Sequence, residues 1–268
     1  MKPISRGVVA WAGCVGMCSV LWSCSAWSGD RAVDARDEGQ AEVKSETRAE
    51  SVAAVQAPAP GEAKRVGGDL LAKVTGTDGN YRAGSCFIDT PLPKGYPLPT
   101  PPGAIEIKSY PSVRRAVVKG SETPDAGMND TFWPLFNHIK KHDIAMTSPV
   151  EMDFEGLKAE KGAQPTEWSM AFLYRTPELN ETGQEKNVTV EDSAPMTVVS
   201  VGMKGNYSMK LVRSGMEQIE AWLARNPEWK PAGSWRTLYY NGPAIRFWNK
   251  WAEVQLPVKA ASTASGAR

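Results

Sequence analysis

The sequence has 268 residues, with 31 Lys and Arg against 30 Asp and Glu, so its formal net charge at neutral pH is +1. A nucleic-acid-binding protein needs a cationic surface that neutralises phosphates. The balanced charge therefore argues against nucleic acid as a partner, and the length allows one or two domains.

The amino terminus predicts export. A basic start is followed by an uncharged apolar run over residues 7–22, which is shorter than the ~20 residues of a membrane-spanning helix. The run ends in Leu-Trp-Ser-Cys at residues 21–24, which resembles the bacterial lipobox. We expect residues 1–24 to be a signal peptide and Cys24 to carry a lipid that anchors the exported protein to a membrane of the cell envelope. The alternatives are cleavage after Ala26, giving a soluble periplasmic or secreted protein, and an uncleaved anchor.

Two segments of low structural content are predicted to follow. Residues 25–69 are dominated by small, charged and proline residues, which provide too little apolar surface to offset the entropy of ordering, so they predict a disordered tether. Residues 70–103 contain Cys86 and then a series of prolines that ends at Pro102. This composition predicts a proline-rich arm, in which Cys86 is expected to be a small buried residue.

The folded domain is predicted over residues 104–258, followed by a disordered tail at residues 259–268. β-Branched and apolar residues alternate or cluster in six segments, which predicts strands. The segments are residues 113–119, 144–154, 167–175, 196–204, 235–240 and 252–258.

Two segments show the apolar spacing of amphipathic helices. The first is expected to begin at the caps Asn129 and Asp130, with Pro134 still in its opening turn. Its apolar stripe consists of Phe132, Leu135, Phe136 and Ile139. The second helix is predicted over residues 208–225 and is expected to end before Pro227. Its stripe consists of Met209, Val212, Met216, Ile219 and Leu223.

Two similar strings, residues 116–120 and 201–205, lie about 85 residues apart. Each closes a predicted strand and is followed by a helix and two strands, which indicates a duplicated β-α-β-β unit. Two such units can pair their strands into one curved sheet or open barrel, with both helices packed on one side. The sequence thus predicts an α+β fold with a cleft at the seam between the halves.

The string Ile-Ala-Met-Thr-Ser-Pro-Val at residues 144–150 closely resembles the signature of the SOUL/heme-binding-protein family. Residues 106–111 are similar to the family's opening strand, and residues 168–173 to its hydrophobic strand. The resemblance covers about 150 residues, although residues 140–143 replace a turn that the family often has before the signature. It implies a distorted open β-barrel of two β-α-β-β units, similar to gyrase-inhibitor-like effector-binding domains. It also implies heme, or another tetrapyrrole, as the ligand of an apolar groove.

The family resemblance places the groove beside the first helix and under the loop at residues 241–250. Aromatic rings there would cover the flat macrocycle, and cations would pair with its propionates. The aromatic candidates are Phe247, Trp248 and Trp251, and the cationic ones are Lys140, Lys141, Arg246 and Lys250. Alternatively, the aromatics close the barrel and the cations are merely solvated.

The chain has two histidines, His138 and His142, four residues apart on one helix face. Two ligands alone make no metal site, so no metal site is predicted. The predicted stripe places His142 at its border and His138 toward solvent, so His142 is the better axial ligand if heme binds. Met146 is the second axial candidate, although an apolar residue in a strand is normally part of the core. The hydroxyls of the signature are expected to bond nearby backbone groups.

The sequence contains no glycine-rich phosphate loop and no Gly-x-Ser-x-Gly elbow, which disfavours nucleotide chemistry and hydrolysis. The predicted function is non-covalent binding of heme or a related flat amphipathic molecule, without catalysis. One alternative is an enzyme acting on tetrapyrroles or other small molecules, with His142 as acid-base group or metal ligand. Another is an interaction module that docks an envelope protein through residues 90–102 and leaves its groove empty.

Overall fold

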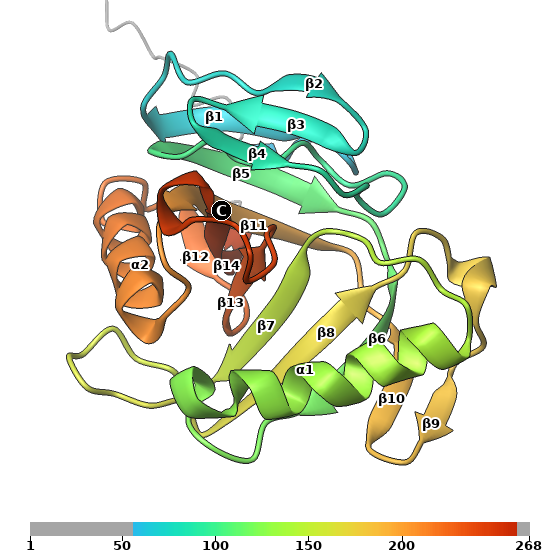
Figure 1. Cartoon of the computed structure of the whole chain (residues 1–268). Helices are drawn as coiled ribbons and strands as arrows, with labels where there is room; N and C mark the ends of the chain where they lie inside the picture. Colours follow the sequence, from blue (N-terminus) through green and yellow to red (C-terminus); the bar gives the residue numbers. More distant parts are fainter. Residues whose placement is uncertain (1–55, 262–268) are drawn as a thin grey trace, which may run out of the picture. The chain divides into compact units, whose positions relative to one another are not determined.

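The computed structural model describes residues 56–261, drawn in colour in Figure 1. The predicted signal peptide with Cys24, most of the predicted tether and the end of the predicted tail lie outside the described residues. Among the helices of the described part, none is long and apolar enough to span a membrane.

The described residues form a large antiparallel sheet, a small sheet, two α-helices and two short 3-10 helices. The strands of the large sheet are β1 (Ala63–Gly68), β5 (Ala104–Tyr110), β6 (Arg114–Lys119), β7 (Val150–Glu155), β8 (Glu167–Leu173), β9 (Gly183–Glu185), β10 (Val188–Asp192), β11 (Met196–Lys204), β12 (Trp229–Pro231), β13 (Trp235–Tyr239) and β14 (Trp251–Ala260). The small sheet contains β2 (Thr75–Thr77), β3 (Asn80–Ala83) and β4 (Cys86–Ile88). The helices are α1 (Pro124–Lys141), α2 (Met209–Leu223), η1 (Pro177–Leu179) and η2 (Phe247–Asn249).

The large sheet has the order β1-β5-β11-β14-β13-β7-β8-β6-β10-β9, and β12 pairs with the end of β14. The expected α+β class is correct. The sheet is not closed into a barrel, however, because the path ends at β1 on one side and at β9 on the other, and these two strands do not pair with each other.

The order strand, helix, strand, strand occurs twice along the chain, with the short strand β12 added after α2 in the second set. In the first set β6 pairs with β8 and β8 with β7, and in the second β11 pairs with β14 and β14 with β13. The two sets meet where β7 pairs with β13, with Phe154 opposite Trp235. That the sets arose by duplication stays a prediction.

Helix α1 begins earlier than predicted, and it buries Leu135 and Ile139 of the predicted stripe. It starts at Pro124, after Thr123, so Pro134 lies inside the helix rather than in its first turn. The helix packs on β8 and β6 through residues spaced four and three apart, namely Thr131, Leu135 and His138. Of the other stripe residues, Phe132 is partly buried against the core, whereas Phe136 is exposed.

Helix α2 has the predicted face. Ser208 caps it by accepting a hydrogen bond of 3.4 Å from the amide of Leu211, and the helix packs on β11 and β14. Gly215 lies directly over β14, where an added Cβ atom would come within 2.5 Å of the side chain of Val254. Only glycine permits this close approach of helix and sheet.

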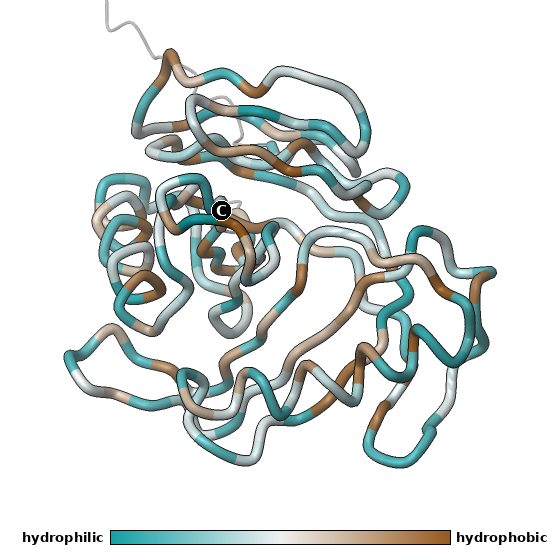
Figure 2. The backbone as a smooth tube through the Cα atoms, viewed as in Figure 1, coloured by the Kyte–Doolittle hydropathy of each residue, from teal (hydrophilic) through white to brown (hydrophobic). Residues whose placement is uncertain are grey.

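Two apolar cores lie on the two faces of the sheet. The larger one fills the face that carries both helices, and in Figure 2 hydrophobic residues run along β7 and β8. The second lies among Tyr110, Val198, Leu238 and Trp251 on the opposite face and is covered by side chains of β3, β4 and Leu92. The sheet therefore has one helical cover and one cover made by the chain that precedes β5.

This second cover corrects the predicted domain boundaries. Residues 63–68 form β1, paired antiparallel with β5, where a tether was predicted. Residues 70–103 are not a separate arm, because Ile88, Leu92 and Thr100 are buried against the sheet. Within this segment β3 pairs with β2 and β4, and alternate side chains of β3 are buried. The high proline content of the segment hid this strand pattern. Cys86 is buried, as predicted, and burial raises the pKa of its thiol.

The signature at residues 144–150 is mostly a loop, since β7 begins only at Val150. Thr147 Oγ1 donates a hydrogen bond to the carbonyl of Leu173, and Ser148 Oγ donates one of 3.0 Å to the carbonyl of Tyr240. The predicted role of these hydroxyls is confirmed. They join the ends of β8 and β13, so the signature acts as a structural link.

Candidate functional site

The loop between β13 and β14 exposes two aromatic rings. Phe247 is 52% exposed and Trp248 is 44% exposed, and their ring centroids lie 4.9 Å apart in an edge-to-face arrangement. The Arg246 guanidinium lies 5.3 Å from the centre of the Trp248 ring. The loop thus exposes two aromatic rings that stand nearly perpendicular to each other, with a cation over one of them.

Side chains from three segments hold this loop in place. The Asn241 side chain accepts a hydrogen bond of 2.7 Å from the amide of Trp251 and donates one of 2.7 Å to the carbonyl of Phe87 in β4. Ser85 Oγ donates to the carbonyl of Trp248 at 3.0 Å. Lys250 Nζ lies 4.9 Å from the centre of the Tyr207 ring, and burial lowers its pKa. The aromatic surface is therefore anchored on the small sheet.

Trp251 does not belong to this surface. It is fully buried in the second core, and its Nε1 donates a hydrogen bond of 2.7 Å to the carbonyl of Thr100. Alternation along β14 explains the error, because the first residue of the strand points into the sheet's covered face while the loop before it stays in solvent. Trp251 is unavailable to a ligand.

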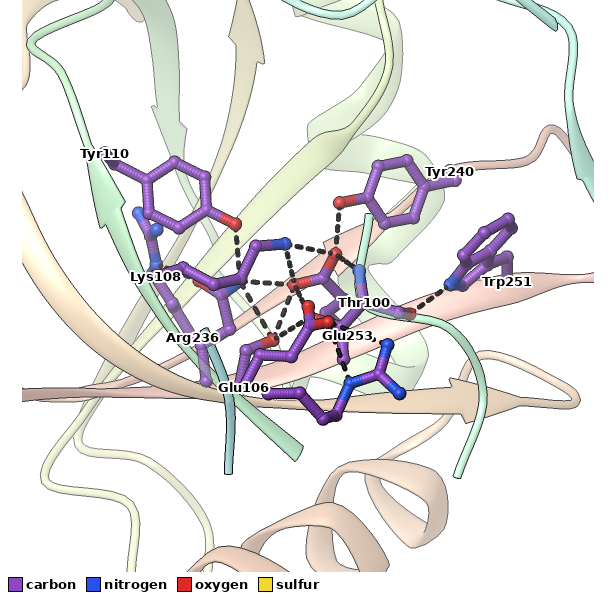
Figure 3. Close-up of polar contacts among 11 residues, drawn as sticks. Thr100, Glu106, Lys108, Tyr110, Arg236, Tyr240, Trp251 and Glu253 are labelled. Carbon is purple, nitrogen blue, oxygen red and sulfur yellow. Dashed lines mark hydrogen bonds and ion pairs between the residues drawn. The ribbon is translucent and has the colours of Figure 1, made fainter. Parts of the chain in front are cut away.

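Beside Trp251 lies a buried polar network (Figure 3). Lys108 Nζ donates to both carboxylate oxygens of Glu253 at 3.0 Å, and both side chains are fully buried. The same carboxylate accepts hydrogen bonds from the amide of Thr100, the hydroxyl of Ser200 and the hydroxyl of Tyr240. Burial alone would raise the pKa of Glu253, but Lys108 and these donors hold it below its usual value. The carboxylate is ionised, and both of its oxygens already accept hydrogen bonds from protein donors. The network therefore stabilises the fold.

Further buried and partly buried ion pairs lie across the sheet from Lys108 and Glu253. Arg236 donates to Glu151 at 2.9 Å, and Arg115 contacts Glu151, Asp153 and Glu191, the last two at 2.8 and 2.9 Å. Three carboxylates thus share two guanidiniums. Burial and the neighbouring Glu151 raise the pKa of Asp153 to about 6, although Arg115 opposes this shift.

Replacing Asp153 by Asn should change how stability depends on pH. A carboxyl whose pKa is higher in the folded than in the unfolded protein favours folding in its neutral form, so its contribution is lost as pH rises from about 4 to about 6. Relative to the wild type, D153N should therefore gain free energy of unfolding over this window, by up to about 1–2 kcal/mol after allowance for partial exposure. Urea unfolding at pH 4, 5, 6 and 7 measures this gain, and a constant difference between the two proteins would contradict it.

The two histidines have the reverse of the predicted environments. His138 is 5% exposed, and its Nε2 lies 2.9 Å from the hydroxyl of Tyr174, whereas His142 is exposed. His142 Nε2 lies 2.7 Å from Glu185 Oε2 in β9. Burial, followed by the neighbouring His142, lowers the pKa of His138. Hydrogen bonds from Lys141 and His142 lower the pKa of Glu185 to about 2.

A second exposed aromatic surface lies on α1. Phe132 packs against Phe172 of β8, with ring centroids 5.1 Å apart, and stacks on Phe136 at 6.0 Å. Trp133, beside them, is 57% exposed. The first helix therefore carries the rings of Trp133 and Phe136 toward solvent, and of these two only Phe136 was part of the predicted buried stripe.

The structure divides the predicted groove residues between different elements. Lys140, Lys141 and His142 end α1, and the last two contact Glu185. Met146 packs against the helix-side core. The loop residues 246–250 instead contact β4 and β11. The aromatic surface of the loop and its cations stay together, while His142 belongs to another cluster.

Three cavities lie in the described residues near these elements. One of about 590 Å³ lies between β1 and the segment after it, lined by Arg65, Leu98 and Glu106. One of about 310 Å³ lies between α2 and the β7–β13 seam, lined by Phe154 and Trp235 among others. The third, about 170 Å³, lies beside His138. The seam cavity is at the lower limit of typical ligand pockets, which span about 300–1,000 Å³.

Glu185 and Trp133 were missed as candidates. Trp133 could have been found from its place next to two phenylalanines on a helix, but the predicted stripe took those rings for core. No sequence pattern pointed to Glu185 as a candidate, because only the pairing of β9 with β10 brings it to the end of α1.

Residues 95–257, more than half of the chain, match the family model described as SOUL heme-binding protein. No curated protein matches the sequence. Solved structures with distant likeness include the EcmrR C-terminal domain, with 16% identity and a TM-score of 0.49 over 59% of this chain and 98% of that chain. A hydrolase from Listeria innocua has 13% identity and a TM-score of 0.44 over 60% of this chain and 94% of that chain. A putative bacterial transcription regulation protein from Staphylococcus aureus has 14% identity and a TM-score of 0.33 over 58% of this chain and 98% of that chain.

Proposed function

Because the chain belongs to the SOUL heme-binding protein family, we propose that it binds heme, or a related flat amphipathic tetrapyrrole, without converting it. The observation that carries this proposal is the exposed pair Phe247 and Trp248 beside Arg246. Large aromatic rings in solvent mark binding surfaces more often than scattered small apolar residues do. A macrocycle can pack its face on one such exposed ring and its edge on the other, and its carboxylates need a cation nearby.

The proposed site is the loop surface, with Lys250 as a second cation. Lys250 lies at the base of the loop, over the Tyr207 ring, and its three donors suit a propionate carboxylate. Trp251 is left out of the site because it is buried, and His142 because it faces Glu185. Apolar contact supplies the affinity in this arrangement, and the cations orient the ligand.

We further propose that the domain is exported and held at a membrane of the cell envelope through Cys24. The amino-terminal sequence, which lies outside the described residues, supports this part. Incorporation of a radiolabelled fatty acid into the wild type but not into C24S would support lipidation, and equal labelling of both would contradict it.

Titration of the purified chain with hemin, followed by the Soret band, tests the proposed binding. We expect saturation with a Kd in the micromolar range, roughly the affinity of a modest apolar site. The double variant F247S/W248S should raise the Kd about tenfold or more, since tenfold corresponds to 1.4 kcal/mol and two rings are removed. Both residues are exposed, so the fold should be retained.

Two controls accompany this titration. L179S removes another exposed apolar side chain, in η1, and should leave the Kd unchanged. W133S/F136S removes the aromatic surface of α1 and should also leave it unchanged. If W133S/F136S weakens binding and the loop variant does not, the loop is not the site. The absence of a saturable spectral change with the wild type would overturn heme binding itself.

A further inference from the structure

Three metal-ligating side chains converge at the carboxyl end of α1. They are His138 and His142, which are the only histidines of the chain, and Glu185. Their ligand atoms all lie within 4.8 Å of one another. Glu185 Oε2 is 2.7 Å from His142 Nε2 and 3.2 Å from His138 Nδ1. Ligands around a tetrahedral zinc ion, with bonds of about 2.0–2.2 Å, stand roughly 3.3 Å from one another, so the cluster needs only small side-chain rotations.

The buried His138 has an unsatisfied ring nitrogen in this cluster. Its Nδ1 makes no hydrogen bond, although Glu185 Oε2 lies 3.2 Å away, because the two atoms are not in hydrogen-bonding geometry. Its Nε2 lies 2.9 Å from the Tyr174 hydroxyl. When Nε2 carries the proton and donates to that hydroxyl, Nδ1 keeps a lone pair 3.2 Å from a carboxylate oxygen of Glu185. A cation between these two electron-rich atoms would satisfy both.

The contact with Tyr174 also fits a metal ligand. A metal-bound histidine nearly always donates its other ring N–H to a neighbouring group, which fixes the orientation of the ring. His138 lies in the last turn of α1, where Tyr174 from the end of β8 holds it, and Glu185 arrives from the β9–β10 hairpin. The two histidines thus come from the end of α1, and the carboxylate comes from the β9–β10 hairpin.

We propose that His138, His142 and Glu185 bind one divalent transition-metal ion, of which Zn²⁺ is the best fit. Two imidazoles and one carboxylate are a known zinc ligand set that leaves a fourth position open. Here the cavity of about 170 Å³ adjoins the cluster and is lined by Asn137, Lys186 and Asn187, with room for water or a small anion at that position. This site is independent of the proposed tetrapyrrole surface on the β13–β14 loop.

Lys141 is the competitor of the metal. Its ammonium contacts Glu185 Oε1, but its side chain is 64% exposed and can leave the carboxylate for water. A bound Zn²⁺ would replace this ammonium as the partner of Glu185. K141Q removes both the competing cation and its repulsion of the metal, and it should bind Zn²⁺ more tightly than the wild type does.

Equilibrium dialysis of the tag-free full chain against ZnCl2 tests this site. We expect one high-affinity Zn²⁺ per chain. H142A and E185Q, both at partly exposed positions, should each lower the affinity about 10–100-fold, at least the effect of disturbing a supporting group of a metal site. Because the His138 side chain is buried, the Zn²⁺ affinity of H138Q is interpreted only if thermal unfolding shows that the variant is folded.

The matched control is E167Q, which changes another strand glutamate that pairs with an exposed lysine, Lys119; its Zn²⁺ affinity should equal that of the wild type. Long-range ¹H–¹⁵N NMR of the two imidazoles gives a second readout. Zn²⁺ should shift His138 Nδ1 and His142 Nε2, and not the ring nitrogen that contacts Tyr174. Absence of saturable binding, or binding that neither H142A nor E185Q weakens, would overturn the proposal.

Discussion

K108M should destabilise the protein by about 3–5 kcal/mol, the cost of removing one partner of a buried ion pair. Lys108 and Glu253 are both fully buried, and the ammonium contacts both carboxylate oxygens at 3.0 Å. Methionine fills most of the volume but leaves the Glu253 charge without its cation. The remaining donors, among them Ser200 and Tyr240, stabilise the carboxylate only in part. Equilibrium urea unfolding, followed by tryptophan fluorescence, measures the loss.

A second variant separates the buried charge from the altered packing. K108M/E253Q removes both charges and keeps the shape of the pair, so it should recover part of the stability that K108M loses. K119M breaks the exposed pair with Glu167 and should leave the free energy of unfolding unchanged. A loss below about 1 kcal/mol for K108M would contradict a structural role for the network and would leave Glu253 as a candidate ligand group.

W251A should destabilise the protein by about 3–5 kcal/mol, the range for truncating a large buried aromatic residue. The Trp251 side chain is fully buried in the core that the chain before β5 covers, and its Nε1 donates to the carbonyl of Thr100. Truncation therefore removes packing and also leaves that carbonyl without its donor. Thermal and urea unfolding of the purified variant measure the loss.

Trp248, three residues earlier, is the matched control. Its ring is 44% exposed on η2, so W248A should leave stability nearly unchanged while it weakens hemin binding. W251F keeps an aromatic ring and loses the indole donor, so its free energy of unfolding should lie between those of the wild type and W251A. Equal stability of W251A and W248A would show that Trp251 is not a core residue, and the loop surface would then have to include it.

The expected results rest on features that the sequence revealed to different degrees. The 3.6-residue spacing over α2 marks its buried face directly. The signature at residues 144–150 identifies the family, and its hydroxyls join the ends of two strands. The aromatic loop was located from the family resemblance, and its residue types were then read from the sequence. The face of α1 was found only in part. Leu135 and Ile139 are buried and Phe132 packs on β8, but the exposed Phe136 satisfies the same spacing rule, and the buried His138 carries no apolar signal.

The class of fold, the family, the second helix and most central strands follow from the sequence, because each depends on patterns within short segments. Two features emerge only in the folded protein. The chain before β5 covers the far face of the sheet and buries Trp251, and Glu185 lies beside His138 and His142. Such pairings join segments more than 40 residues apart, and several of their strands are only three residues long. Local periodicity reports which side of an element is apolar. It holds no information about which distant element, polar or proline-rich, supplies the surface that covers it.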